Sequence, residues 1–97
     1  MPEFNQDAFA AGLTQLRQRF QIELPQRLAL IEAAWKNSTQ DTASAELLNE
    51  LHRLAGAAGS LGFAEISRLT RELEHTLKHE LVPIDCYLKQ CLQHNVW

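Results

Sequence analysis

Residues 47–63 read LLNELHRLAGAAGSLGF and decide the fold of this chain. Their apolar side chains recur three or four positions apart, which is the spacing of one face of an α-helix. The members of this set are Leu47, Leu51, Leu54, Ala58 and Leu61. At about 100° per residue, all of them lie within about 40° of Leu47 around the helix axis. The stretch therefore predicts a helix with one buried face, which ends near Gly62 because glycine is common just past helix C-termini.

The same spacing continues on both sides of this stretch and predicts three more helices. The apolar residues of the first are Leu13, Leu16, Phe20, Leu24, Leu28, Ile31 and Trp35; those of the next are Phe63, Ile66, Leu69, Leu73 and Leu77; those of the last are Ile84, Leu88 and Cys91. The chain is rich in Leu and Ala and poor in Val and Ile, which also favours helices over strands.

The amino-terminal part is expected to hold a short separate helix over residues 5–11, with Asn5 as its N-cap, after a frayed terminus at residues 1–4. Pro25 lies inside the long apolar stripe that follows. Proline removes a backbone hydrogen bond and bends a helix, but the apolar phase runs through it without a slip. We therefore predict one long, kinked helix there.

The other helix ends are indicated by capping residues and by proline. Asp41 or Thr42 is expected to cap the helix that carries residues 47–61. Residues 78–82 are predicted to be a break, and Pro83 suits the first turn of the last helix. Four amphipathic helices joined by short loops bury their apolar faces most simply together. The predicted fold is all-α, an antiparallel four-helix bundle with a short additional N-terminal helix.

Length and composition exclude several classes of function. The 97 residues, 45% hydrophobic and 22% charged, fit a single domain spanning residues 1–97. The net charge of −3 argues against a basic surface that would bind nucleic acid. No apolar run is long enough to form a membrane-spanning helix. No secretory signal opens the chain, so a cytoplasmic location is expected. Cys86 and Cys91 form neither a redox nor a zinc motif, and we expect reduced thiols near the helix core.

Two glycines inside a helix mark the candidate site. Gly56 and Gly59 each cost about 1 kcal/mol relative to alanine, so something should offset that cost. With Ala45 and His52 they form a second stripe, roughly 120–180° from the apolar face. One interpretation is close packing of a neighbouring helix. The other is an exposed imidazole on a cleared surface, where a second protein can bring a reactive group to a ring nitrogen.

Residues 51–63, LHRLAGAAGSLGF, resemble the motif of the histidine phosphotransfer (HPt) domain family, and Leu69, Leu73 and Glu74 also match its pattern. This resemblance implies a phosphorelay intermediate, in which His52 accepts a phosphoryl group from the aspartyl phosphate of a receiver domain and passes it to another receiver. It also implies that Gly62 serves the turn into the next helix.

The resemblance implies partners but no cofactor of the chain's own. Response-regulator receiver domains, and a hybrid sensor kinase upstream, are the expected partners, with magnesium bound by the receiver. We predict that the surface docking them comprises Ala45, Leu48, Ala55, Gly56 and Gly59. We expect a monomer with no metal site, and no kinase activity because the chain has no glycine-rich ATP loop.

Ala55 departs from the family pattern. Many members carry lysine at this position, three residues after the histidine, whereas Arg53 projects about 100° away from His52. The alternative function is therefore a helical interaction module that binds a receiver without phosphotransfer. A third hypothesis is a metal site at His75 and His79, one turn apart. We expect these histidines to lie on a solvated face, because no further ligand motif accompanies them.

Overall fold

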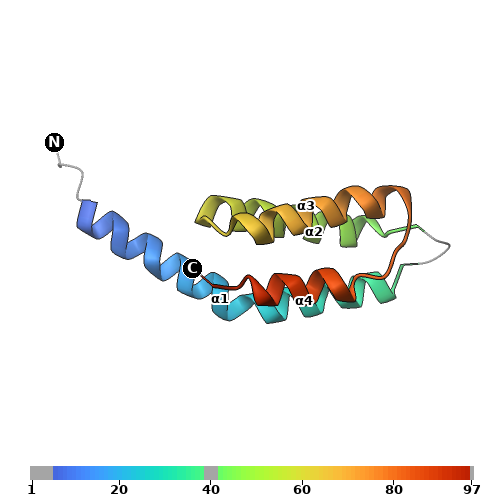
Figure 1. Cartoon of the computed structure of the whole chain (residues 1–97), viewed down its shortest axis with the longest axis horizontal. Helices are drawn as coiled ribbons and strands as arrows, with labels where there is room; N and C mark the ends of the chain where they lie inside the picture. Colours follow the sequence, from blue (N-terminus) through green and yellow to red (C-terminus); the bar gives the residue numbers. More distant parts are fainter. Residues whose placement is uncertain (1–5, 39–41, 97) are drawn as a thin grey trace.

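The computed structural model describes residues 6–38 and 42–96, and this part of the chain contains four helices and no strand. They are α1 (Gln6–Lys36), α2 (Ala45–Leu61), α3 (Ala64–His79) and α4 (Asp85–Gln93). The all-helical class is thus confirmed. Figure 1 shows successive helices running in opposite directions, with α2 and α3 above α1 and α4. The contact between α2 and α3 is the most extensive, and α1 packs on α2, α4 on α3, and α4 on α1.

The apolar stripes meet in one core between the helices. Its largest fully buried apolar side chains are Leu24, Ile31, Leu47, Leu51, Leu54, Ile66, Leu73, Leu77, Ile84 and Cys91. Burial of a single leucine or isoleucine side chain is worth about 1.5–3 kcal/mol, so this shared core is the main stabilising contribution to the fold. The apolar face of α2 is therefore held in the core, and the opposite face of this helix points away from the core.

The turn between α2 and α3 is closed by glycine and by two contacts from α1. Gly62 adopts the left-handed conformation, with φ of 90°, which a residue with a side chain rarely adopts. Phe63 stacks on Phe20 with ring centroids 4.6 Å apart. The Nε of Arg17 donates to the carbonyl oxygen of Leu61 at 2.9 Å. These contacts hold the end of α2 in place, and the predicted end at Gly62 is confirmed.

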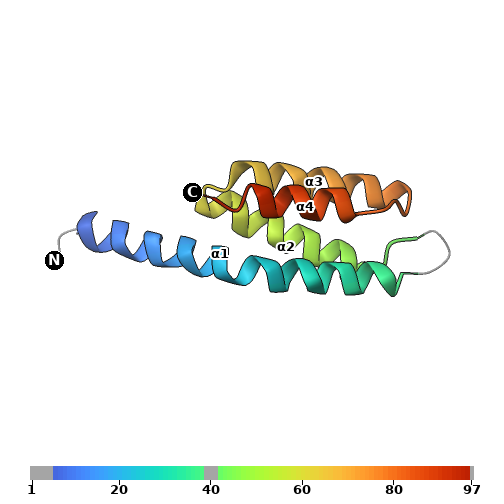
Figure 2. The same ribbon diagram turned by 60° about the horizontal axis from the view of Figure 1, so that its bottom comes forward.

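The predicted separate N-terminal helix is wrong, because α1 is one continuous helix from Gln6 to Lys36. It passes through Pro25, as expected, and Figure 1 shows a change of direction between its first and second halves. The first half extends past the other helices (Figures 1 and 2). Leu16 is consequently 52% exposed, although it belongs to the predicted apolar stripe. Asn5 and residues 1–4 lie outside the described residues.

Three predicted helix boundaries also need correction. Ser44, and not Thr42, caps α2, since its hydroxyl oxygen accepts from the amide of Leu47 at 3.1 Å; Asp41 lies outside the described residues. The third helix continues to His79, inside the predicted break. The last helix begins at Asp85, so Pro83 precedes it and does not form its first turn. The start of α2 at Ser44 and the end of α3 at Glu80, whose amide donates to the carbonyl of Thr76, follow hydrogen bonds that apolar periodicity does not encode.

The two cysteines lie in different environments. Cys91 is buried in the core, but Cys86 is exposed, so the expectation of two thiols near the core is wrong for Cys86. Burial raises the pKa of the Cys91 thiol to about 11. The thiolate is the reactive form of cysteine, so Cys91 should react slowly near neutral pH.

We expect iodoacetamide at pH 8 to alkylate Cys86 and to leave Cys91 unmodified. A thiol with a pKa about two units above its usual value has about a hundredfold less thiolate, and burial also blocks access. Mass spectrometry of the intact protein should show one added group in native buffer and two in denaturant. Equal modification of both cysteines in native buffer would contradict the buried position of Cys91.

Candidate functional site

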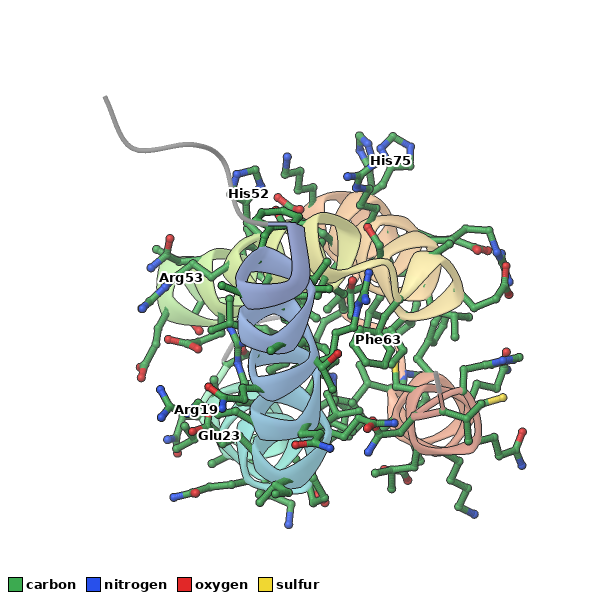
Figure 3. All side chains as sticks on the ribbon, turned by 90° about the vertical axis from the view of Figure 1, so that its left-hand side faces the viewer. Arg19, Glu23, His52, Arg53, Phe63 and His75 are labelled. Atoms are coloured by element: carbon green, nitrogen blue, oxygen red, sulfur yellow. The ribbon has the colours of Figure 1, made fainter. Side chains whose placement is uncertain are left out.

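His52 lies in the middle of α2, on the side opposite its buried leucines. Its side chain is 77% exposed. Figure 3 shows the imidazole at the outer surface of α2, with Arg53 pointing to a different side of the helix. Arg53 instead lies beside Glu50, with Nη1 and Oε1 3.6 Å apart. The rigid helix thus presents an accessible ring nitrogen to solvent, and no positive charge from α2 accompanies it there.

One face of α3 meets the imidazole from across the helix pair. Arg71, Glu74 and Lys78 are spaced by three and four residues, so they lie along one side of α3. The Oε1 atom of Glu74 is 3.5 Å from Nδ1 of His52, and its Oε2 atom is 3.5 Å from Nζ of Lys78. The Glu74 side chain is only 14% exposed, and its carboxylate lies between the imidazole of His52 and the ammonium group of Lys78.

An open hollow of about 390 Å³ lies beside these groups, between α2 and α3. The residues that line it are His52, Ala55, Gly56, Arg71, Glu74 and Lys78. A Cβ atom built on Gly56 would meet no atom within 4 Å, so this glycine leaves the space next to the imidazole empty. The site therefore combines an exposed nucleophile, room for an incoming group, and two cations.

Gly59 has a different environment from Gly56. A Cβ atom there would lie 3.2 Å from Oγ of Ser67 and 3.4 Å from Nη2 of Arg71. The Ser67 hydroxyl is buried and donates to the carbonyl oxygen of Ala55 at 3.0 Å, which ties α3 to α2. Close packing thus accounts for Gly59, and the interpretation of a cleared surface applies at Gly56.

The five residues of the predicted docking surface differ in exposure. Ala45, Gly56 and Gly59 are exposed, and Leu48 is half-buried. Ala55 is only 2% exposed, so it adds little area to any contact, and its carbonyl oxygen accepts from Ser67 of α3. The docking role of the set stays a prediction.

His75 and His79 form an exposed histidine pair on α3. The rings of His75 and His79 have their centroids 5.1 Å apart, and both residues are exposed. Glu72, one turn earlier, accepts from Nη1 of Arg68 at 3.1 Å. Within residues 6–38 and 42–96, no group of three or more metal-ligating side chains occurs. The exposure of both histidines agrees with the expected solvated face, and the absence of a metal site stays a prediction.

Arg71 and Lys78 were not assigned to the site from the sequence, although their positions carried a signal. Both lie on the face of α3 that also holds Glu74, a residue of the family pattern. Projecting α3 onto a helical wheel would have placed all three on one side. Which side of α3 faces His52, however, depends on how the two helices pack.

The fold and the site define a small all-helical domain that presents one imidazole, flanked by charged groups, on a helix surface. The sequence matches the family model described as Hpt domain over residues 15–96, and the chain belongs to this family. Membership implies histidine phosphotransfer in phosphorelay signalling, as a phosphocarrier that interacts with response-regulator receiver domains.

Searches of curated proteins and of solved structures returned no match. Among the described helices, none has the length and apolar character needed to cross a membrane.

Proposed function

We propose that this chain is a phosphoryl carrier of a multistep His–Asp phosphorelay in the cytoplasm, with His52 as the phosphoacceptor. It accepts the group from the aspartyl phosphate of one receiver domain and passes it to another. The observation that carries the proposal is the 77% exposed imidazole, with a carboxylate at one ring nitrogen and the open space of Gly56 beside it. In this proposal the four helices act as the antiparallel bundle that supports the site.

The contact with Glu74 suits the imidazole for nucleophilic attack. A carboxylate beside Nδ1 favours the proton on that nitrogen, which leaves the lone pair on Nε2. Attack of Nε2 on phosphorus forms a P–N bond and breaks the P–O bond to the aspartyl group, whose carboxylate leaves with the electron pair. Transfer in the other direction reverses these steps. Such transfers depend mainly on positioning and on neutralising charge, so a rigid helix and a receiver with its own magnesium ion are sufficient.

A test of this function uses a receiver domain that has been phosphorylated with radiolabelled acetyl phosphate. Incubated with this receiver and magnesium, the chain should acquire label within minutes. The label should be lost in acid and kept in base, as expected of a phosphoramidate. With ATP alone it should acquire none. Acid-stable label, or incorporation from ATP without a kinase, would contradict the phosphocarrier function.

Ala55 keeps the second candidate function open. Because this position carries no charge, the domain could bind receivers as an interaction module without taking the phosphoryl group. The two functions differ in the same experiment when binding is measured alongside labelling. A receiver that forms a complex with the chain, but transfers no label to it, would favour the interaction module.

A further inference from the structure

A phosphoryl group on His52 needs neighbouring positive charge, and α2 does not supply it. Phosphoryl groups on serine, threonine and tyrosine carry about −1.5 to −2 charges near neutral pH, and the phosphoryl oxygens on a histidine are likewise anionic. Ala55 is uncharged and buried, and Arg53 lies on another side of α2 beside Glu50 (Figure 3). Whatever cation serves the site within this chain must therefore come from another helix.

Arg68 is an unsuitable source, although it lies on α3. Its guanidinium donates to both carboxylate oxygens of Glu65 and to Glu72. The hydrogen bond to Glu65 also raises the pKa of Arg68. These two carboxylates already neutralise its charge, and the hollow beside His52 is not lined by Arg68.

Arg71 and Lys78 are better placed, because both line the hollow that holds the imidazole. Lys78 touches the same carboxylate as His52, at 3.5 Å from the other oxygen of Glu74. Its side chain is 54% exposed and has a flexible four-carbon stem. Its ammonium group can therefore move towards the imidazole while it stays at the surface. Arg71 flanks the same space from the side of Gly59.

We propose that Lys78 and Arg71, on the neighbouring helix, hold the phosphoryl group on His52, and that they take the place of the lysine that Ala55 lacks. This inference rests on the proposed function. In the unphosphorylated protein, Glu74 balances Lys78. When the P–N bond forms at Nε2, phosphoryl oxygens compete with Glu74 for the ammonium group, and Lys78 turns towards them. Glu74 keeps its contact with the Nδ1 proton, so no proton has to leave the site.

The test uses the small molecule phosphoramidate as phosphoryl donor in place of a receiver, so labelling does not depend on the docking of a protein. The variants are Lys78→Gln, Arg71→Gln and Lys78→Arg, with Lys89→Gln on α4 as the matched loss of an exposed positive charge. We expect labelling of His52 to slow by about tenfold in Lys78→Gln and by a similar or smaller factor in Arg71→Gln. Lys89→Gln should label at the rate of the unaltered protein, and Lys78→Arg, which keeps the positive charge, should recover most of the rate that Lys78→Gln loses.

A second readout separates charge from structure. The ³¹P NMR signal of phosphorylated His52 shifts with pH as the phosphohistidine takes up a proton. Nearby cations favour its deprotonated form and lower the midpoint, so removing Lys78 should raise the midpoint by about 0.5 unit. The titratable and charged groups that line the hollow are His52, Arg71, Glu74 and Lys78. A purely structural role of Lys78 would leave this midpoint unchanged.

The outcomes distinguish this inference from the proposed function. If His52 takes label at the same rate and titrates at the same midpoint in all variants, the cations are not used and the inference is wrong, while the phosphocarrier function stands. If the unaltered protein takes label on His52 from neither phosphoramidate nor a phosphorylated receiver, the proposed function itself fails.

Discussion

Replacing His52 with glutamine should abolish labelling by a phosphorylated receiver and leave the fold intact. The amide nitrogen of glutamine is not nucleophilic, so no P–N bond can form. The side chain at this position is 77% exposed, and its Nδ1 lies 3.5 Å from the carboxylate of Glu74. Surface substitutions of this kind change stability by about 0.5 kcal/mol or less. Circular dichroism and thermal melting should therefore be nearly unchanged, while incorporation of label falls to background.

The other histidines provide the matched controls for this experiment. His75, His79 and His94 are also exposed, but they lie on α3 and at the end of α4 and do not line the hollow. Glutamine at any of these three positions should leave labelling unchanged. Equal labelling of His52→Gln and the unaltered protein would mean that one of them is the phosphoacceptor. In that case the assignment of the site to α2 would be wrong.

The helices could be predicted because large apolar residues recur regularly along them. The errors lie in segments that hold too few large apolar residues to show such a pattern. Residues 8–12 are mostly alanine and glycine, and they hold few large apolar side chains that could mark one face of a helix. The helix α1 runs through them because nothing there ends it. At the start of α2, Asp41, Thr42 and Ser44 can all cap a helix, and only the contact of Ser44 with Leu47 distinguishes them.

The site was predictable in part for a similar reason. His52 and Gly56 stand out from the sequence, since an exposed histidine and a helical glycine on one stripe of α2 need no knowledge of the other helices. The contribution of α3 depends on tertiary packing, which one sequence does not encode locally. Glu74 could be noted from the family pattern, but its contacts with His52 and Lys78 follow from how α3 lies on α2. The packing of α3 on α2 also places Ser67 and Arg71 close to Gly59 and leaves the space beside Gly56 open.

The second large effect is expected from substitutions at these two glycines. The sequence predicts that Gly59 faces solvent on the docking surface and matters more for docking than for folding, with packing against another helix as the alternative. The short distances from its Cβ position to Ser67 and Arg71 support the alternative. Gly56→Ala should stabilise the protein, because alanine is favoured over glycine in a helix by about 1 kcal/mol and its Cβ meets open space. That corresponds to a rise in Tm of about 4–8 °C for a domain of this size.

Gly59→Ala gains the same helix propensity but must displace the hydroxyl of Ser67, which is held by the carbonyl of Ala55. Overfilled contacts cost about 1–3 kcal/mol, so we expect a Tm that is unchanged or lowered. A clear rise in Tm for Gly59→Ala, matching that of Gly56→Ala, would show that Ser67 and Arg71 yield easily and that close packing is not the reason for this glycine.

Longer side chains should separate docking from folding at the same positions. Gly56→Gln places a neutral chain in the hollow beside His52, so transfer from a phosphorylated receiver should slow by about tenfold, equivalent to about 1.4 kcal/mol, with a Tm at or above that of the unaltered protein. Gly59→Gln should instead lower the Tm, because its first carbon already meets Ser67. Thermal melts and transfer rates of the two variants check both expectations. Unimpaired transfer in Gly56→Gln would mean that the receiver approaches His52 from another side, and that the open space at Gly56 is not part of the docking surface.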